Sequence, residues 1–141
     1  MAEFLTRGWN VAIPEVDIGD DIFVVQDDNG TLRRVQVKTS TSTPWQKKYT
    51  GRFNVPINQL RNNSNVPVHY VLIVRHDNGW SQPVIIRQDY LLDLWETNKI
   101  GSEYKGSLNL HFTYANGEVK CSKIDLTKFI ADFTDFPVID E

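Results

Sequence analysis

The chain has 141 residues, 40% hydrophobic and 23% charged, a composition typical of one globular domain and not of a disordered or coiled-coil protein. A single cysteine, Cys121, excludes an internal disulfide and a multi-thiolate zinc site, and it favours a reducing cytoplasm. The net charge of −3 excludes a strongly basic nucleic-acid coat protein, and no apolar run has the length of a membrane span or a signal-peptide core.

The first predicted elements are a short helix at Ala2–Arg7 and two strands, Asp21–Val25 and Leu32–Lys38. The strands flank Asn29-Gly30, the strongest short-range signal for a β-hairpin. A polar loop is expected at Thr39–Pro44.

The remaining elements follow from apolar runs and capping residues. In chain order they are a central strand at His69–Val74, a strand at Val84–Ile86, a helix from Asp89, a hairpin of Leu108–Tyr114 and Val119–Ile124 around Asn116-Gly117, and a last helix from Asp125. We therefore expect a single α/β domain over residues 1–141, with a mixed central sheet of five or six strands flanked by helices and a C-terminal hairpin and helix.

The first hairpin brings chemical groups together if Asn29-Gly30 is a two-residue turn. Asp21 then lies opposite Lys38 and Phe23 opposite Gln36, so that Asp21, Gln36 and Lys38 share one face. A loop of odd length without a bulge would place Asp21 and Lys38 on opposite faces. A carboxylate and an amide oxygen can share a hard cation such as Mg²⁺, with the lysine beside it facing a phosphate. The alternative is an ordinary cross-strand ion pair.

Charge is distributed unevenly. Residues 1–28 carry seven acidic side chains against one arginine, residues 29–76 carry eight basic and no acidic side chains, and residues 77–141 carry eleven acidic and six basic ones. The acid-free stretch predicts a nucleic-acid-binding surface, with a solvated loop as the alternative. Its candidate phosphate contacts and base-stacking rings are Lys47, Lys48, Arg52, Trp45 and Tyr49.

The stretches Phe4–Pro14, Val16–Asp21 and Val35–Thr39 together resemble the PD-(D/E)xK nuclease superfamily, which includes many restriction enzymes and some homing endonucleases. The family places an acidic residue on a first helix, an Asp at the opening of one strand and a (Glu/Gln)-x-Lys at the end of the next. The resemblance implies a restriction-endonuclease-like sheet. It also implies a metal site of Asp21, Gln36, Glu3 and the backbone carbonyl of Val37, with Lys38 as the catalytic lysine. Gln36 replaces the commoner glutamate, so the site has one negative charge fewer.

The expected function is therefore hydrolysis of DNA phosphodiester bonds by a Mg²⁺-dependent endonuclease, with Mn²⁺ as a possible substitute. Cutting both strands would need a homodimer or two encounters. The alternatives are an inactive module of the same fold that binds nucleic acid or a protein, and an unrelated β-rich interaction protein. No motif for a nucleotide cofactor is present. The three histidines lack metal-ligand spacing, and Cys121 is expected to be a buried, inert thiol.

Overall fold

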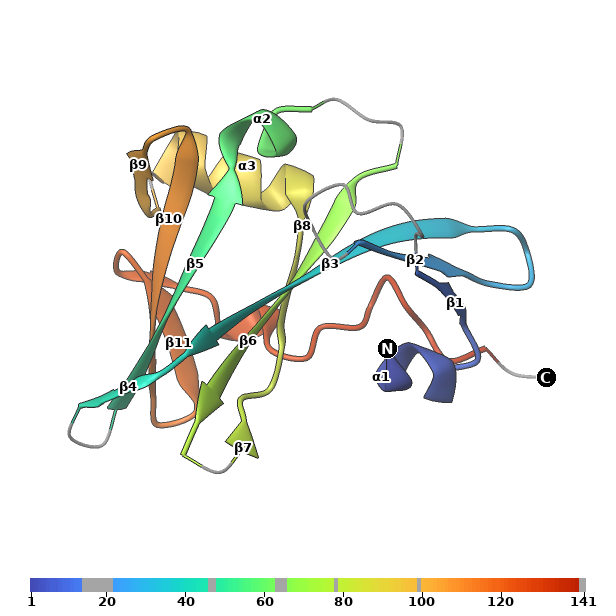
Figure 1. The fold of residues 1–141 in the computed structure, drawn as a ribbon, viewed down its shortest axis with the longest axis horizontal. Helices are drawn as coiled ribbons and strands as arrows, with labels where there is room; N and C mark the ends of the chain where they lie inside the picture. The colour runs from blue at the N-terminus through green and yellow to red at the C-terminus, as the bar shows by residue number, and fades with distance from the viewer. Residues whose placement is uncertain (14–21, 46–47, 63–65, 78, 99, 140–141) are drawn as a thin grey trace.

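Two six-stranded β-sheets pack against each other, with short helices at their edges (Figure 1). The computed structural model describes residues 1–13, 22–45, 48–62, 66–77, 79–98 and 100–139, with only the backbone described at 22–24, 43–45 and 98. In these ranges, no helix is long and apolar enough to cross a membrane.

Sheet A is mixed. Its strands are β1 (Asn10–Ala12), β2 (Ile22–Gln26), β3 (Leu32–Thr41), β6 (Val68–His76), β7 (Gly79–Trp80) and β8 (Val84–Arg87). The first three form an antiparallel meander after helix α1 (Ala2–Thr6), β6 then pairs with β3 in parallel, and β7 and β8 pair antiparallel with β6. The parallel β3–β6 pair forms the centre of the sheet.

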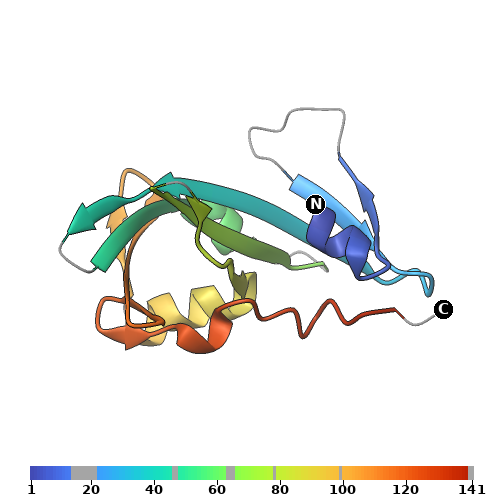
Figure 2. The ribbon, with the colours of Figure 1, turned by 90° about the horizontal axis from the view of Figure 1, so that it is seen from below.

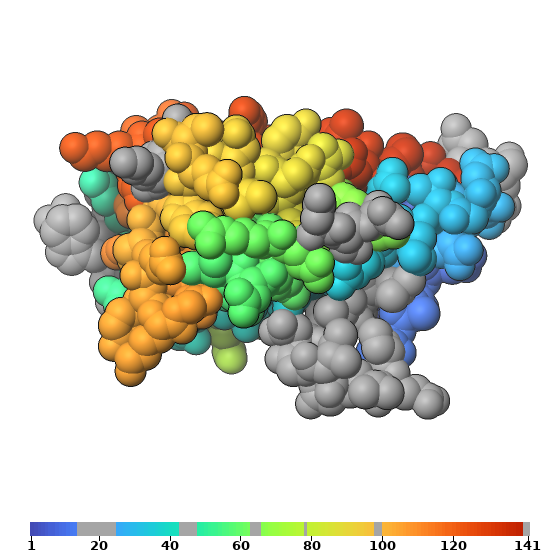
Figure 3. Space-filling model, turned by 90° about the horizontal axis from the view of Figure 1, so that it is seen from above, coloured from blue at the N-terminus to red at the C-terminus, as the bar shows by residue number. Residues whose placement is uncertain are grey.

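Sheet B is antiparallel. Its strands are β4 (Thr43–Trp45), β5 (Lys48–Pro56), β9 (Ser102–Tyr104), β10 (Ser107–Ala115), β11 (Glu118–Cys121) and β12 (Ile124–Asp125). Helices α2 (Ile57–Leu60) and α3 (Gln88–Asn98) lie side by side over one end of the two sheets (Figure 3).

The main core lies between the two sheets and the helices. Alternate residues of β5, such as Phe53 and Val55, face alternate residues of β6, such as Tyr70 and Leu72. All four are at most 2% exposed. The alternation along β5 fixes which of its sides faces solvent, whereas β6 is buried on both sides.

A second core covers the opposite face of sheet A. It consists of Phe4, Trp9, Val25, Val35, Val71, Ile85 and Phe136. The C-terminal segment, residues 130–139, runs past α3 to the region of α1 (Figure 2). It is fastened there by hydrogen bonds from Trp9 Nε1 to the Pro137 carbonyl and from the Ile139 N–H to the Arg7 carbonyl, both 2.8 Å.

The α/β class, with mixed β-structure in sheets of about the predicted size, is confirmed, as are the first helix, the central strand and the hairpin at Asn116-Gly117. The predicted loop at Thr39–Pro44 is wrong, because β3 continues to Thr41 and β4 begins at Thr43. The second sheet, built on β5 and β10, was not predicted.

The predicted last helix is also wrong. Only Thr127–Phe129 form a short 3₁₀ turn. Ala131 adopts the left-handed region with φ +49°, and its N–H donates to the Pro83 carbonyl at 2.7 Å instead of to a helical partner. Pairing of Ile130 with Val84 therefore replaces helical hydrogen bonding here.

Candidate functional site

Gln36 and Lys38 lie on one face of β3, at the centre of sheet A. Gln36 pairs with Tyr70 of β6, and Lys38 pairs with Leu72. Because paired residues share a face, Gln36 and Lys38 lie on the side of sheet A that faces the main core. Val37, between them, packs its side chain against the second core. The structure thus brings together two of the predicted site residues, Gln36 and Lys38.

The Gln36 side chain is buried without hydrogen bonds. It is 1% exposed, and neither Oε1 nor Nε2 has a partner in the structure as described. Burying an amide without compensation costs about 1–3 kcal/mol, so such a group needs an explanation. A cation or hydrogen-bond donor in contact with Oε1, together with an acceptor in contact with Nε2, would provide one. Of these two atoms, Oε1 is a suitable ligand for a hard cation.

A polar network adjoins Gln36 through its β6 neighbour. The hydroxyl of Tyr70 donates to Gln59 Oε1 at 2.9 Å. The buried Gln88 accepts from the Val68 N–H at 3.0 Å and donates to the carbonyls of Gln59 and Asn62, both at 2.8 Å. Helix α2 is thereby held against the start of β6. Sequence reasoning missed Gln88, because its partners are 20 or more residues away.

The register predicted for the first hairpin is wrong by one residue. Ile22, not Phe23, pairs with Gln36, and Phe23 pairs with Val35. The cause is a loop with three residues between Asp27 and Thr31. The carboxylate of Asp27 accepts hydrogen bonds from the N–H groups of Asn29 and Thr31, and Gly30 adopts φ +79°. A glycine in this conformation closes a three-residue loop instead of a two-residue turn. Because the loop length is odd, the described pairing puts Ile22, not Phe23, on the face of Gln36 and does not support the predicted shared face of Asp21, Gln36 and Lys38. Asp21 itself lies outside the described residues.

Glu3 lies away from Gln36. It is exposed on α1 and forms an ion pair with Arg7, with Oε1 3.2 Å from Nε. The neighbouring Phe4 packs into the second core with Val35, on the face of sheet A opposite Gln36. The structure therefore does not bring Glu3 and Gln36 together.

The predicted nucleic-acid contacts divide between the two faces of β5. Lys48 and Arg52 are exposed on the outward side. Tyr49 points inward, and its ring stacks on those of Tyr114 and His76, with centroids 4.6 Å away in each case. Burial raises the pKa of the Tyr49 hydroxyl. Lys47 and the side chain of Trp45 lie outside the described residues.

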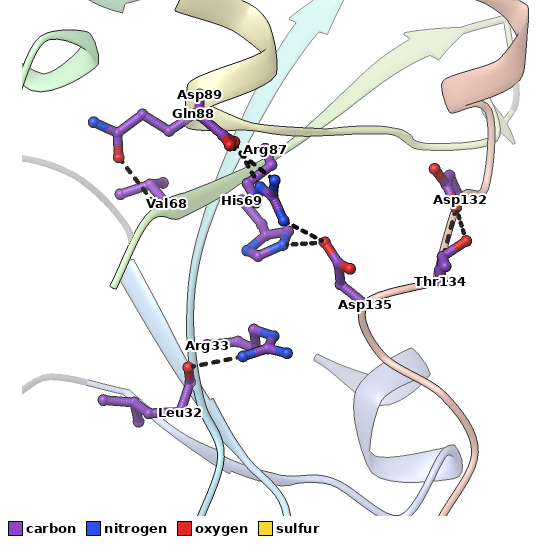
Figure 4. Close-up of polar contacts among 10 residues, drawn as sticks. All are labelled: Leu32, Arg33, Val68, His69, Arg87, Gln88, Asp89, Asp132, Thr134 and Asp135. Atoms are coloured by element: carbon purple, nitrogen blue, oxygen red, sulfur yellow. Dashed lines mark hydrogen bonds and ion pairs between the residues drawn. The ribbon is translucent and has the colours of Figure 1, made fainter. Parts of the chain in front are cut away.

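A second polar cluster lies on the opposite face of sheet A (Figure 4). His69 Nε2 is 2.8 Å from Asp135 Oδ2, and Arg87 forms two hydrogen bonds with Asp89 and lies 3.9 Å from Asp135. Burial lowers the pKa of His69, although the hydrogen bond with Asp135 opposes this shift. A small cavity of about 140 Å³ adjoins the cluster.

The polar cluster around His69 contacts the C-terminal segment, residues 130–139. The ring of His69 meets that of Phe136 edge to face, with centroids 5.0 Å apart, so the cluster fastens the C-terminal segment to the sheet. Sequence reasoning treated His69 as an ordinary strand histidine, because its partner is 66 residues away.

Within the described ranges, no three His, Cys, Asp or Glu side chains gather where they could hold a metal ion. Comparison with known proteins adds no family assignment: no family model, no curated protein and no solved structure matches this chain.

Proposed function

We propose that the chain is a metal-dependent nuclease of the PD-(D/E)xK type, which hydrolyses phosphodiester bonds of DNA. The observation that carries the proposal is the Gln36 side chain, buried with both amide atoms unpartnered, on the same strand face as Lys38. The Gln-x-Lys pattern requires a glutamine and a lysine two residues apart on one face of a strand.

The order of the elements also supports the proposal. Helix α1 precedes the meander, β2 begins directly after Asp21, and β3 carries Gln36-Val37-Lys38. The next strand of sheet A, β6, is parallel to β3. Related domains have a helix or loop followed by a core strand after the lysine. In this chain α2 and β6 follow in that order, with β4 and β5 of sheet B between them and Lys38.

Gln36 Oε1 and the Val37 carbonyl would hold Mg²⁺ or Mn²⁺, and the resemblance, not the described strand pairing, adds Asp21. Bound there, the ion would polarise the scissile phosphate and lower the pKa of a coordinated water. Lys38 places an ammonium group on the face of Gln36, where it stabilises negative charge that develops on the phosphate oxygens. The surrounding main core excludes bulk water from the buried side of the site and strengthens this electrostatic contribution.

Two observations favour the second candidate, an inactive module of the same fold that binds nucleic acid. Glu3 is engaged with Arg7 on the other face of the sheet, and Gln36 carries no charge. Both features reduce the negative charge available to a cation, and metal affinity rises with the number of charged ligands.

Cleavage of supercoiled plasmid and of single-stranded DNA with Mg²⁺, Mn²⁺ or EDTA tests the proposal. The Lys38→Ala variant should lose at least about 100-fold in rate, the scale for removal of one transition-state electrostatic partner. Lys128→Ala, an exposed lysine on the 3₁₀ turn, is the matched control and should cleave as the wild type does. Equal nicking by wild type and Lys38→Ala would overturn the proposal. Metal binding and retarded DNA migration without cleavage would support the inactive module.

A further inference from the structure

The outward side of sheet B is a continuous polar surface. The residues of its strands that point away from the main core are Lys48, Thr50, Arg52, Asn54 and Pro56 on β5, Ser107, Asn109, His111, Thr113 and Ala115 on β10, Glu118 and Lys120 on β11, Ser102 and Tyr104 on β9, and Asp125 on β12. We call this surface the outer face. Among the described side chains, Pro56, Ala115 and Tyr104 are its apolar or aromatic members, each at the end of a strand, so the described part of the face lacks the apolar centre of a typical protein–protein interface.

Two hollows of about 480 and 500 Å³ lie on the outer face and meet at His111. Arg52, which pairs directly with His111, lines the first, and Lys120 and Lys123 line the second. Ser102 and Asn109 line both hollows. Hydrogen-bond donors and cations thus follow one path across β5, β10 and β11.

The cations on this path are available to a ligand. Within the described part of the chain, Arg52, Lys120 and Lys123 form no ion pair with any carboxylate. Of the two acids on the outer face, Asp125 accepts a hydrogen bond of 2.8 Å from the Thr127 N–H and lies directly opposite Lys120. Arg52, Lys120 and Lys123 nevertheless give the path more positive than negative charge, on a protein whose net charge is negative.

The outer face is joined to the candidate site through one hydrogen bond. The N–H of Arg52 donates to Oγ of Ser40 at 2.9 Å. Ser40 lies two residues after Lys38 on the same side of β3, a step of roughly 7 Å along a strand. The Arg52 position on the edge of sheet B therefore lies beside the part of β3 that follows Lys38. Seen from above, the β9–β10 hairpin projects beyond α2 (Figure 3), at the C-terminal end of β5.

We propose that the outer face binds the sugar-phosphate backbone of DNA and guides it to the Gln36–Lys38 site. This inference rests on the proposed nuclease function and extends it by Lys120, Lys123 and His111, which lie outside the acid-free stretch of the sequence. Charge complementarity favours DNA over a protein partner. The cations Arg52, Lys120 and Lys123, with amide and hydroxyl donors between them, match a row of phosphates.

The test measures binding of a labelled 20-base-pair duplex by fluorescence anisotropy at several salt concentrations with Mg²⁺. All chains carry Lys38→Ala so that cleavage does not interfere. Adding Lys120→Gln and Lys123→Gln should weaken binding and reduce the slope of log K against log salt by about two, since each phosphate contact contributes about one. Adding Arg75→Gln and Lys128→Gln instead removes the same charge from exposed positions elsewhere and should leave the slope unchanged.

An equal slope for the two double variants would overturn the outer-face proposal, and so would the absence of binding by the parent chain. Neither result decides the nuclease proposal, which depends on plasmid cleavage by the chain that retains Lys38. Conversely, a slope change limited to the Lys120 and Lys123 variant would support the outer face even if no cleavage were found.

Discussion

The backbone N–H of Arg52 donates a hydrogen bond of 2.9 Å to the hydroxyl oxygen of Ser40. The N–H lies on the edge of β5 that turns away from β10, beyond the short stretch where β4 covers this edge. A side chain of sheet A thereby satisfies an edge donor of sheet B, an arrangement that also protects a free strand edge from pairing with another chain.

We predict that Ser40→Ala lowers the free energy of unfolding by about 0.5–1.5 kcal/mol, the usual net value of one hydrogen bond. Ser40→Thr retains a hydroxyl acceptor and should lose less. Urea unfolding of both variants measures the difference, and equal losses would mean that the hydrogen bond with Arg52 does not contribute.

Gln36→Leu should stabilise the metal-free protein by about 1–3 kcal/mol, because it removes two buried polar atoms that lack partners and keeps a similar volume. The same variant should lose any stabilisation that millimolar Mg²⁺ gives the wild type, since a ligand stabilises only a state that binds it. Urea unfolding with and without Mg²⁺ gives both quantities. A less stable metal-free Gln36→Leu would show that the amide is satisfied in solution.

The stability conferred by His69 should depend on pH. Its folded-state pKa lies below the usual value of about 6.5, chiefly because of burial, with Arg33 and Arg87 contributing and Asp135 opposing. As pH falls through about 6.5, the unfolded chain therefore takes up a proton that the folded chain does not, and folding stability decreases until the folded-state pKa is passed.

His69→Gln retains a donor toward Asp135 but has no titratable ring. The stability difference between wild type and this variant should shrink as pH falls from about 7.5 to 5.5, as measured by urea unfolding at each pH. A difference that stayed constant or grew would mean that the pKa of His69 is not lowered by folding.

Phe136→Ala should cost about 3–5 kcal/mol, because the ring is fully buried against Phe4, Trp9 and His69. Val138→Ala is the control two residues away: its side chain is 60% exposed, and the expected change is within about 0.5 kcal/mol. Similar losses in the two variants would show that the C-terminal segment is not part of the cooperative fold.

The elements that are specified by residues adjacent in the sequence were predicted correctly. The continuous apolar run at His69–Val74 predicted the buried strand β6, and Asn116-Gly117 predicted the turn of the β10–β11 hairpin. The site pair was also predictable, because Gln36 and Lys38 share a strand face in any register of the hairpin. Which residue of β2 lies opposite them was not, because Asp27 and Gly30 set the loop length.

Sheet B was not predicted, although the sequence of β5 has the alternation of a half-buried strand. Tyr49, Phe53 and Val55 alternate with Lys48, Arg52 and Asn54, the period of a half-buried strand. Their partners on β10 lie more than 50 residues later, so the pairing could not be read locally. The alternation along β5 also separates the outward Arg52 from the inward Tyr49, two residues that the sequence analysis placed in one group.

The second core has a consequence for synthesis on the ribosome. Phe4 and Trp9 are synthesised more than 120 residues before Phe136, the ring that covers them. Sheet A can pair its meander early, yet the apolar face of the second core stays open until Phe136 has been synthesised. During synthesis this apolar face is therefore exposed to non-native contacts. It becomes buried only when residues 136–139 pack against α1 and β1.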